Sequence, residues 1–254
     1  MGKLKDDALR SDDLKGKTVL VTGAARRIGR EIALAAARAG GDVAITYLTS
    51  ERQARQTVAE LRRLGARALA LRCDVGQEKS VRATVKQVVR EFGGIDVLVN
   101  NAGFYETVEF SKISIEQWDK MFATNARGPF LMSQAATKTL RERKGRIVNL
   151  GSLGGLRPWA THAHYCASKA AVNMLTQVMA KALAPKIAVN CVAPGMIDVS
   201  DKSGSAFLRK LASKTPMQRN GSAEDVARAV LFFATAPHFI TGQVMAVDGG
   251  LGLE

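Results

Sequence analysis

Short apolar segments rich in β-branched residues alternate with longer amphipathic segments along almost the whole chain, and this alternation most constrains the fold. In the first unit, the sequence TVLVT (18–22) lies between Gly16 and Gly23 and predicts a buried strand, which an alanine-rich helix over 30–39 follows. Repeated strand–helix–strand units form right-handed crossovers, so the chain is expected to build a parallel sheet. Further strands are expected at 42–48, 66–72, 95–99, 146–150, 187–192 and 243–247, and further helices at 51–64, 77–92, 115–143 (with a bend near Gly128–Pro129), 165–184 and 223–235.

The predicted fold is α/β, a single-domain Rossmann-like doubly wound parallel sheet of about seven strands with helices on both faces. The domain is expected to span 15–254, because no Pro/Gly/Ser-rich linker divides the chain. Residues 1–14 alternate acids and bases without an apolar stretch, which predicts a flexible N-terminal extension and not a secretory signal. Residues 197–220, rich in Ser, Lys and Gly, are expected to form a lid.

The composition narrows the classes of function. The net charge of +14 would suit nucleic acid, a membrane surface or an acidic partner, but the 37 Lys and Arg are spread along the chain. Their densest cluster, 141–146, falls at an expected helix C-terminus, where cations are favoured anyway. No nucleic-acid module is recognisable and no apolar run approaches the ~20 residues of a membrane span, so both partners are disfavoured. Cys73, Cys166 and Cys191 lack metal spacing, which predicts reduced core thiols, no metal site and a cytoplasmic protein.

One tyrosine has a lysine four residues later, and this spacing has a chemical use. In a helix over 165–184, Tyr165 and Lys169 lie on one face, so the ammonium can reach the phenol. A nearby cation favours the phenolate, and we expect it, helped by the positive charge of a bound cofactor, to lower the phenol pKa from about 10 towards neutrality. Ser152, just beyond the strand at 146–150, would donate a second hydrogen bond to a substrate oxygen that moves between carbonyl and alkoxide. The alternative is a surface Tyr and Lys without a chemical role.

The glycine turn between the first strand and helix is a second candidate site. GAARRIG (23–29) follows a strand and opens a helix, the setting in which backbone N–H groups bind a pyrophosphate. Two glycines alone are a weak signal, and the strand–turn–helix context supplies the weight.

Taken in order, these motifs resemble the short-chain dehydrogenase/reductase family over residues 16–250. The resemblance rests on TGAARRIG (22–29), CDV (73–75), NNAG (100–103), Asn125, Ser152, YCASK (165–169), the Pro194–Gly195 pair and TGQVMAVDGG (241–250).

The resemblance implies roles for the matching positions. Asn125, Ser152, Tyr165 and Lys169 would form the catalytic set, with Asn125 holding a water that links Lys169 to solvent. For Asn125, a polar residue that bends the helix is the alternative, and for Asp74 a turn residue at the strand end is. The residues implied in cofactor binding are Gly23, Arg26, Arg27, Ile28, Gly29, Tyr47, Thr49, Ser50, Asp74, Val75, Asn101, Ala102, Gly103, Tyr165, Lys169, Pro194, Gly195 and Ile197.

Two positions depart from the family pattern. Arg27 stands where the turn usually carries glycine, and this form of the motif is similar to that of pteridine reductases and some carbonyl reductases. Val199 stands where a threonine commonly binds the nicotinamide carboxamide, which leaves Ser200 as a substitute or a shifted lid.

The choice of dinucleotide follows from charge. The second strand ends in TYLTS (46–50) without an acid before Glu51, so nothing there would repel a 2′-phosphate, and arginines and hydroxyls surround the position. The expected cofactor is therefore NADP(H).

The expected reaction is reduction of a carbonyl to a secondary alcohol, most simply in a 3-oxoacyl thioester carried by an acidic acyl carrier protein that meets Lys202, Arg209, Lys210 and Lys214 of the lid. Other small ketones, pteridines, quinones, sugars or steroids remain alternatives, as does a non-catalytic nicotinamide sensor.

His162 and His164 are expected to be polar surface. The family also implies a homotetramer or dimer paired through the helices at 115–143 and 165–184. The candidate substrate pocket is Phe104, Tyr105, Leu156, Trp159, His162, Met196 and Phe207.

Overall fold

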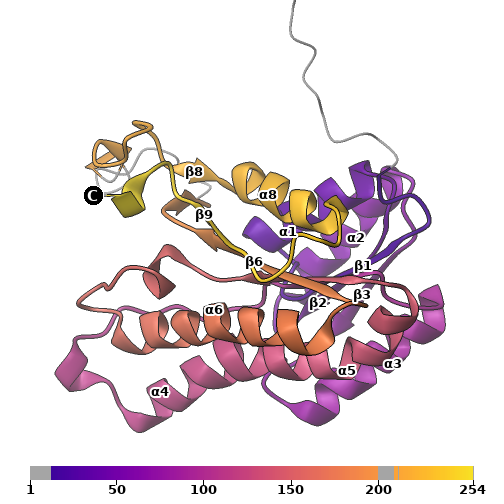
Figure 1. Cartoon of the computed structure of the whole chain (residues 1–254), viewed down its shortest axis with the longest axis horizontal. Coiled ribbons are helices and arrows are strands. Elements are labelled where there is room, and N and C mark those ends of the chain that lie inside the picture. The colour runs from indigo at the N-terminus through magenta and orange to yellow at the C-terminus, as the bar shows by residue number, and fades with distance from the viewer. Residues whose placement is uncertain (1–12, 200–208, 211, 254) are drawn as a thin grey trace, which may run out of the picture.

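The computed structural model contains one seven-stranded parallel sheet between two layers of helices (Figure 1). The strand order β3-β2-β1-β4-β5-β6-β9 reverses direction at β1, which is the doubly wound arrangement that the alternation predicts. All its neighbouring strands pair in parallel. The strands are β1 (Thr18–Val21), β2 (Asp42–Tyr47), β3 (Ala68–Arg72), β4 (Val97–Asn100), β5 (Arg146–Leu150), β6 (Ala188–Pro194) and β9 (Val244–Val247).

The helices cover both faces of the sheet. One layer holds α1, α2 and α8, and the other holds α3, α5 and α6 with α4 beside α6 (Figure 1). Because each face is covered, β1, β4 and β6 are buried along their whole length, and their sequences are mostly apolar. The helices are α1 (Arg27–Arg38), α2 (Glu51–Arg63), α3 (Glu78–Phe92), α4 (Ile115–Phe122), α5 (Gly128–Glu142), α6 (Ala163–Leu183) and α8 (Ala223–Thr235).

The helical region expected over 115–143 is divided into α4 and α5. The division is a π-helical turn, Ala123–Arg127, directly before Gly128. Pro129 is the second residue of α5 and, since helical backbone precedes it, has no N–H to donate to the turn before it. The regular α-helix is therefore interrupted directly before Gly128–Pro129, where the sequence predicts a bend.

The structure describes residues 13–199, 209–210 and 212–253. The expected extension 1–14 lies outside these ranges apart from Asp13 and Leu14. Leu14 is buried in the core and its N–H donates to the Ala39 carbonyl, so the folded domain includes it. The described ends of the expected lid pair in a small parallel sheet, β7 (Ile197–Asp198) with β8 (Gly221–Ser222). No described helix is long and apolar enough to cross a bilayer.

Candidate active site

Ser152, Tyr165 and Lys169 converge just beyond the carboxyl end of β5. The 3₁₀ turn Leu153–Gly155 leads from β5 to α6, and a Cβ on Gly155 would lie 2.7 Å from the Lys169 carbonyl carbon. Only glycine permits this approach, which brings Ser152 next to the first turns of α6. The Ser152 hydroxyl is buried and accepts the Gly154 N–H at 3.0 Å.

Tyr165 and Lys169 lie one turn apart on the same side of α6. The Lys169 Nζ is 5.9 Å from the centroid of the Tyr165 ring and donates to the Leu150 carbonyl at 2.8 Å. Lys169 is buried, with 6% of its surface exposed. The lysine therefore joins the end of β5 to the tyrosine helix.

Burial shifts the pKa values of both members of the pair. Burial raises the pKa of Tyr165 to about 12, against a smaller lowering by the Ser152 hydroxyl. Burial lowers the pKa of Lys169 to about 8. Without a bound cofactor, the phenol pKa is set by desolvation, and the ammonium is directed to the Leu150 carbonyl; the lowering expected from Lys169 together with a bound cofactor stays a prediction.

Asn125 occupies the π turn, and its side chain is fully used. Its Oδ1 accepts the Phe104 N–H at 2.7 Å, and its Nδ2 donates to the Phe104 carbonyl at 2.9 Å and to the Ser168 hydroxyl at 3.1 Å. The π turn places this amide against both the segment after β4 and α6, as π-bulges often do at functional sites.

The glycine turn is packed against the end of β4. The Asn101 Nδ2 donates to the carbonyls of Thr22 and Gly23, while the Thr22 hydroxyl accepts the N–H groups of Asn101 and Ala102. A Cβ on Gly23, whose φ is +63°, would lie 2.8 Å from the Ala102 Cα, and one on Gly29 would collide with the Asn101 amide. Both glycines are therefore required for this approach.

The N-terminus of α1 suits an anion. It has no side-chain cap and no acidic residue in its first turn. Arg26 and Arg27 are exposed there, and neither makes an ion pair with another described residue. Beyond β2, Thr49 is exposed, and Glu51, the first acid, is already paired with Arg55. These residues fit the phosphate groups of a bound nucleotide.

The other expected cofactor residues also lie along this edge or beside it. Asp74 follows β3 and its Oδ1 accepts the Gly76 N–H at 2.9 Å, which supports the turn interpretation that the sequence left open. Pro194 ends β6 opposite Val247, and a Cβ on Gly195 would lie 2.6 Å from the Asp248 Cβ. The remaining positions are Ile28 in the first turn of α1, Tyr47 at the end of β2, Ser50 before α2, Val75 packed against Gly128, Gly103 whose added Cβ would lie 3.8 Å from the Lys169 Nζ, and Ile197 in β7.

The expected substrate residues are partly assembled. Tyr105 contacts Tyr165 edge-on, with ring centroids 5.0 Å apart at 86°, and the Trp159 ring lies 6.3 Å from that of Tyr165. Leu156 is exposed and Met196 half-buried beside the same edge. Phe207, like Ser200 and Lys202, lies outside the described residues.

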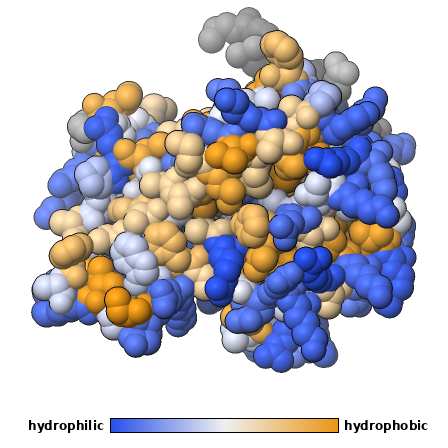
Figure 2. Space-filling view, turned by 60° about the horizontal axis from the view of Figure 1, so that its bottom comes forward, coloured by the Kyte–Doolittle hydropathy of each residue, from blue (hydrophilic) through white to orange (hydrophobic). Residues whose placement is uncertain are grey.

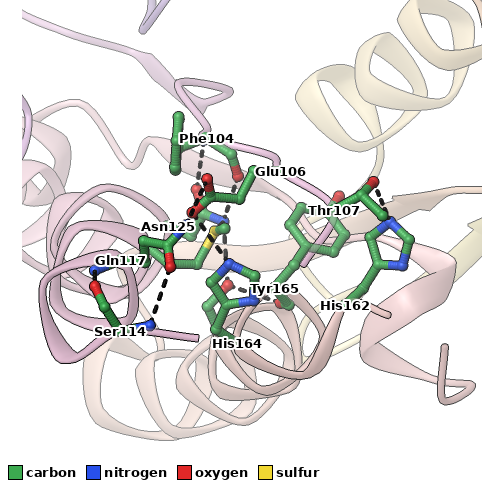
Figure 3. Close-up of polar contacts among 11 residues, drawn as sticks. Phe104, Glu106, Thr107, Ser114, Gln117, Asn125, His162, His164 and Tyr165 are labelled. Atoms are coloured by element: carbon green, nitrogen blue, oxygen red, sulfur yellow. Dashed lines mark hydrogen bonds and ion pairs between the residues drawn. The ribbon is translucent and has the colours of Figure 1, made fainter. Parts of the chain in front are cut away.

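His162 and His164 are buried, so their assignment to polar surface is wrong. His162 is 9% exposed and His164 0%. The His162 Nε2 contacts the Tyr105 hydroxyl. Figure 3 shows His162 beside Thr107 and His164 beside Glu106, the contacts that these histidines make. Glu106 and Thr107 were not among the predicted site residues. The available signal was the sequence HAHY (162–165), which places two histidines just before Tyr165 and so predicts polar partners for them.

The three cysteines are all free thiols. Cys73 and Cys191 are buried and free, whereas Cys166 is half-buried. Among the residues that the structure describes, no group of His, Cys, Asp and Glu is arranged to hold a metal ion.

A doubly wound sheet with a glycine turn at its switch point and a Ser–Tyr–Lys cluster beyond β5 defines a nucleotide-binding α/β protein. The chain matches the family described as enoyl-(acyl carrier protein) reductase over residues 23–252. A 3-oxoacyl-(acyl-carrier-protein) reductase of Staphylococcus aureus is 39% identical over 240 residues, which cover 92% of this chain and 98% of the relative. The chain belongs to the short-chain dehydrogenase/reductase family, and it is an oxidoreductase acting on CH–OH and C=O groups.

Solved structures agree with this assignment. A putative short-chain alcohol dehydrogenase of Sinorhizobium meliloti superposes with a TM-score of 0.88 at 34% identity, covering 94% of this chain and 97% of that one. A blue fluorescent protein from a metagenomic library, solved in complex with NADPH, has a TM-score of 0.88 at 34% identity and covers 94% and 99%.

Proposed function

We propose that this protein is an NADP(H)-dependent reductase that converts a carbonyl to a secondary alcohol, with 3-oxoacyl thioesters on an acyl carrier protein as its substrate class. The convergence of Ser152, Tyr165 and Lys169 beyond β5 is the observation that carries the proposal. The relative from S. aureus and the NADPH complex of a similar structure support the substrate class and the cofactor.

Ser152, Tyr165 and Lys169 would each have a separate role in the reduction. A bound NADPH supplies the hydride. Tyr165, whose raised pKa keeps it protonated at neutral pH, donates the proton to the carbonyl oxygen. Ser152 donates a hydrogen bond to the same oxygen as negative charge develops on it. Lys169, fixed to the Leu150 carbonyl, has ammonium hydrogens left for a ribose hydroxyl.

The cofactor would be held at the glycine turn. The uncapped N-terminus of α1 would bind the pyrophosphate, and Arg26 and Arg27 with Thr49 and Ser50 would surround the 2′-phosphate. Asn125 would hold a water that returns protons to Lys169 through its main chain, because its side-chain amide is bonded to Phe104 and Ser168.

The basic surface suits an acidic carrier. Arg157, five residues after Ser152, is exposed, and so are Arg209, Lys210 and Lys214 of the expected lid. Rim charges of this kind steer association and make it dependent on salt, so the KM for a carrier-bound substrate should rise with ionic strength while that for a small thioester stays constant.

Copies of the chain would associate through the face formed by α4, α5 and α6. Apolar residues gather over the middle of this face (Figure 2). Those of α4 to α6 that remain exposed are Ile115, Trp118, Phe130, Met174 and Val178. An apolar surface of this kind favours pairing of copies as a dimer or tetramer. The cytoplasmic location stays a prediction.

The deciding experiment is NADPH oxidation with a panel of 3-oxoacyl thioesters, simple ketones, pteridines, quinones, sugars and steroids, repeated with Tyr165→Phe. We expect turnover of the thioesters, loss of at least 10³-fold in the variant, and unchanged NADPH binding. Unchanged turnover in the variant would remove Tyr165 from the mechanism. Binding of NADPH without turnover of any compound would favour the sensor.

A further inference from the structure

The segment 104–108 is fastened across the start of α6 by consecutive residues. The Tyr105 hydroxyl lies 2.6 Å from the His162 Nε2, and the Thr107 hydroxyl lies 3.0 Å from the same nitrogen. The Glu106 carboxylate lies 3.2 Å from the His164 Nε2, and the Val108 N–H donates to the Thr161 carbonyl at 3.0 Å. Figure 3 shows the two histidines on either side of Tyr165, each facing this segment.

Tyr105 is therefore both accessible and fixed. Its side chain is largely open to solvent, with the residue 56% exposed, yet the imidazole holds its hydroxyl and Tyr165 its ring edge. An exposed tyrosine normally samples several rotamers, and fixing one costs conformational entropy. Here the hydrogen bond to the buried His162 offsets that cost. The Tyr105 phenol is therefore held in place beside the Tyr165 phenol, the proposed proton donor.

The state of the imidazole decides what Tyr105 can do. Burial lowers the pKa of His162, and the neighbouring His164 lowers it further, so the ring is neutral at pH 7. A neutral imidazole has one N–H donor and one acceptor nitrogen. The Thr161 hydroxyl lies 3.0 Å from Nδ1 and can donate to it. In that tautomer the Nε2–H donates to the Tyr105 oxygen, and the phenolic hydrogen of Tyr105 is free for a ligand.

We propose that Tyr105, positioned by His162, donates a hydrogen bond to a second oxygen of the substrate, and that the site thereby selects 1,3-dicarbonyl compounds such as 3-oxoacyl thioesters over simple ketones. The inference rests on the proposed function. Tyr165 and Ser152 bind the oxygen that is reduced. Because the rings of Tyr105 and Tyr165 are in contact, with centroids 5.0 Å apart, the second carbonyl oxygen of a bound 3-oxoacyl group would come within reach of Tyr105. When the Tyr105 oxygen accepts a hydrogen bond from the His162 Nε2–H, the hydrogen bond that the Tyr105 hydroxyl donates to the substrate becomes stronger, because hydrogen bonds in series polarise one another.

The test compares two substrates in the Tyr105→Phe variant. The substrates are the N-acetylcysteamine thioester of 3-oxobutanoate and 2-pentanone, which lacks the second carbonyl. The kcat/KM for the thioester should fall about fivefold, the effect of one neutral hydrogen bond, and mostly through KM. That for 2-pentanone should stay within about twofold. Retained NADPH binding shows that the variant is folded.

Variants around the imidazole separate positioning from general packing. His162→Ala should reproduce the loss of selectivity, and His162→Gln should restore part of it, since an amide can still donate to the Tyr105 oxygen. Thr107→Val is the matched control: it removes the other hydroxyl at the same nitrogen and should leave the selectivity unchanged.

The possible failures are distinguishable. Equal losses for both substrates, or no loss for either, in Tyr105→Phe would overturn the inference and leave the proposed function standing. If the wild-type protein binds NADPH but reduces neither substrate, the proposed function fails and the inference fails with it.

Discussion

Replacing Arg27 by glycine separates two roles that meet in one residue. Arg27 has a φ of +55°, in the left-handed region that glycine adopts without strain. An arginine pays about 1–2 kcal/mol there. Glycine costs about 0.5–1 kcal/mol in backbone entropy, so Arg27→Gly should be neutral or stabilising by up to about 1.5 kcal/mol. The melting temperature should rise by zero to about 6 °C.

The same substitution should weaken the binding of NADPH. If Arg27 holds the 2′-phosphate, the variant loses a charge-assisted hydrogen bond, worth about 1.5 kcal/mol at an exposed position. That difference corresponds to about a tenfold rise in the Kd of NADPH. NADH has no 2′-phosphate, so its Kd should stay within about twofold. Titration of both dinucleotides by protein fluorescence, at low and high salt, measures the two values.

Lys144 provides a matched control. It also has a positive φ, +48°, but it precedes β5, at the sheet edge opposite Ser152. Lys144→Gly should give the same stability change and leave both dissociation constants alone. The reasoning is refuted if Arg27→Gly weakens NADPH and NADH equally, since the side chain would then act on the shared pyrophosphate.

Three other predictions concern the buried groups. Lys169→Met should stabilise the protein by about 2 kcal/mol at pH 7, because the shift of its pKa from 10.5 to about 8 represents about 3 kcal/mol and the lost hydrogen bond offsets about one. Below pH 8 this cost is fully present, and it disappears as pH rises to 10.5, so the stability gain of the variant should shrink over this range and become a loss of about 1 kcal/mol above pH 10.5, where only the missing hydrogen bond counts. Asn125→Leu should cost about 2–4 kcal/mol in urea unfolding, because the Phe104 N–H and carbonyl lose their partners; a smaller effect would mean that water replaces the amide. Alcohol oxidation, which needs the Tyr165 phenolate, should accelerate about tenfold per pH unit from pH 7 to 9, whereas carbonyl reduction should stay flat; equal profiles would show that another group transfers the proton.

The fold was predictable because local pattern and tertiary environment agree. β1 and β6 are buried on both faces, so their apolar runs have one interpretation. The helix with Tyr165 and Lys169 was expected from 165, and it begins at Ala163. Boundaries of this kind depend on the preceding loop, which a periodic pattern does not encode.

The histidines and the lysine contact were not predictable for a different reason. His162 and His164 are buried by segment 104–108, which comes from a distant part of the sequence and has no periodic pattern of its own. Likewise, the i, i+4 spacing places Lys169 beside Tyr165, but the partner of its ammonium is the carbonyl that ends β5. Spacing determines which residues share a face. Desolvation and long-range hydrogen bonds then determine their charge.

The opposed pKa values of Tyr165 and Lys169 have a common consequence. Burial disfavours both the phenolate and the ammonium, so it raises the pKa of Tyr165 and lowers the pKa of Lys169. At pH 7 the phenol is still protonated, with a phenolate fraction on the order of 10⁻⁵, while the lysine remains mostly charged. The chain alone is therefore poised to give a proton, as reduction requires, and poorly poised to accept one. Since the lysine ammonium is already bonded to the Leu150 carbonyl, most of the charge needed to favour the phenolate in the oxidative direction must arrive with the ligand.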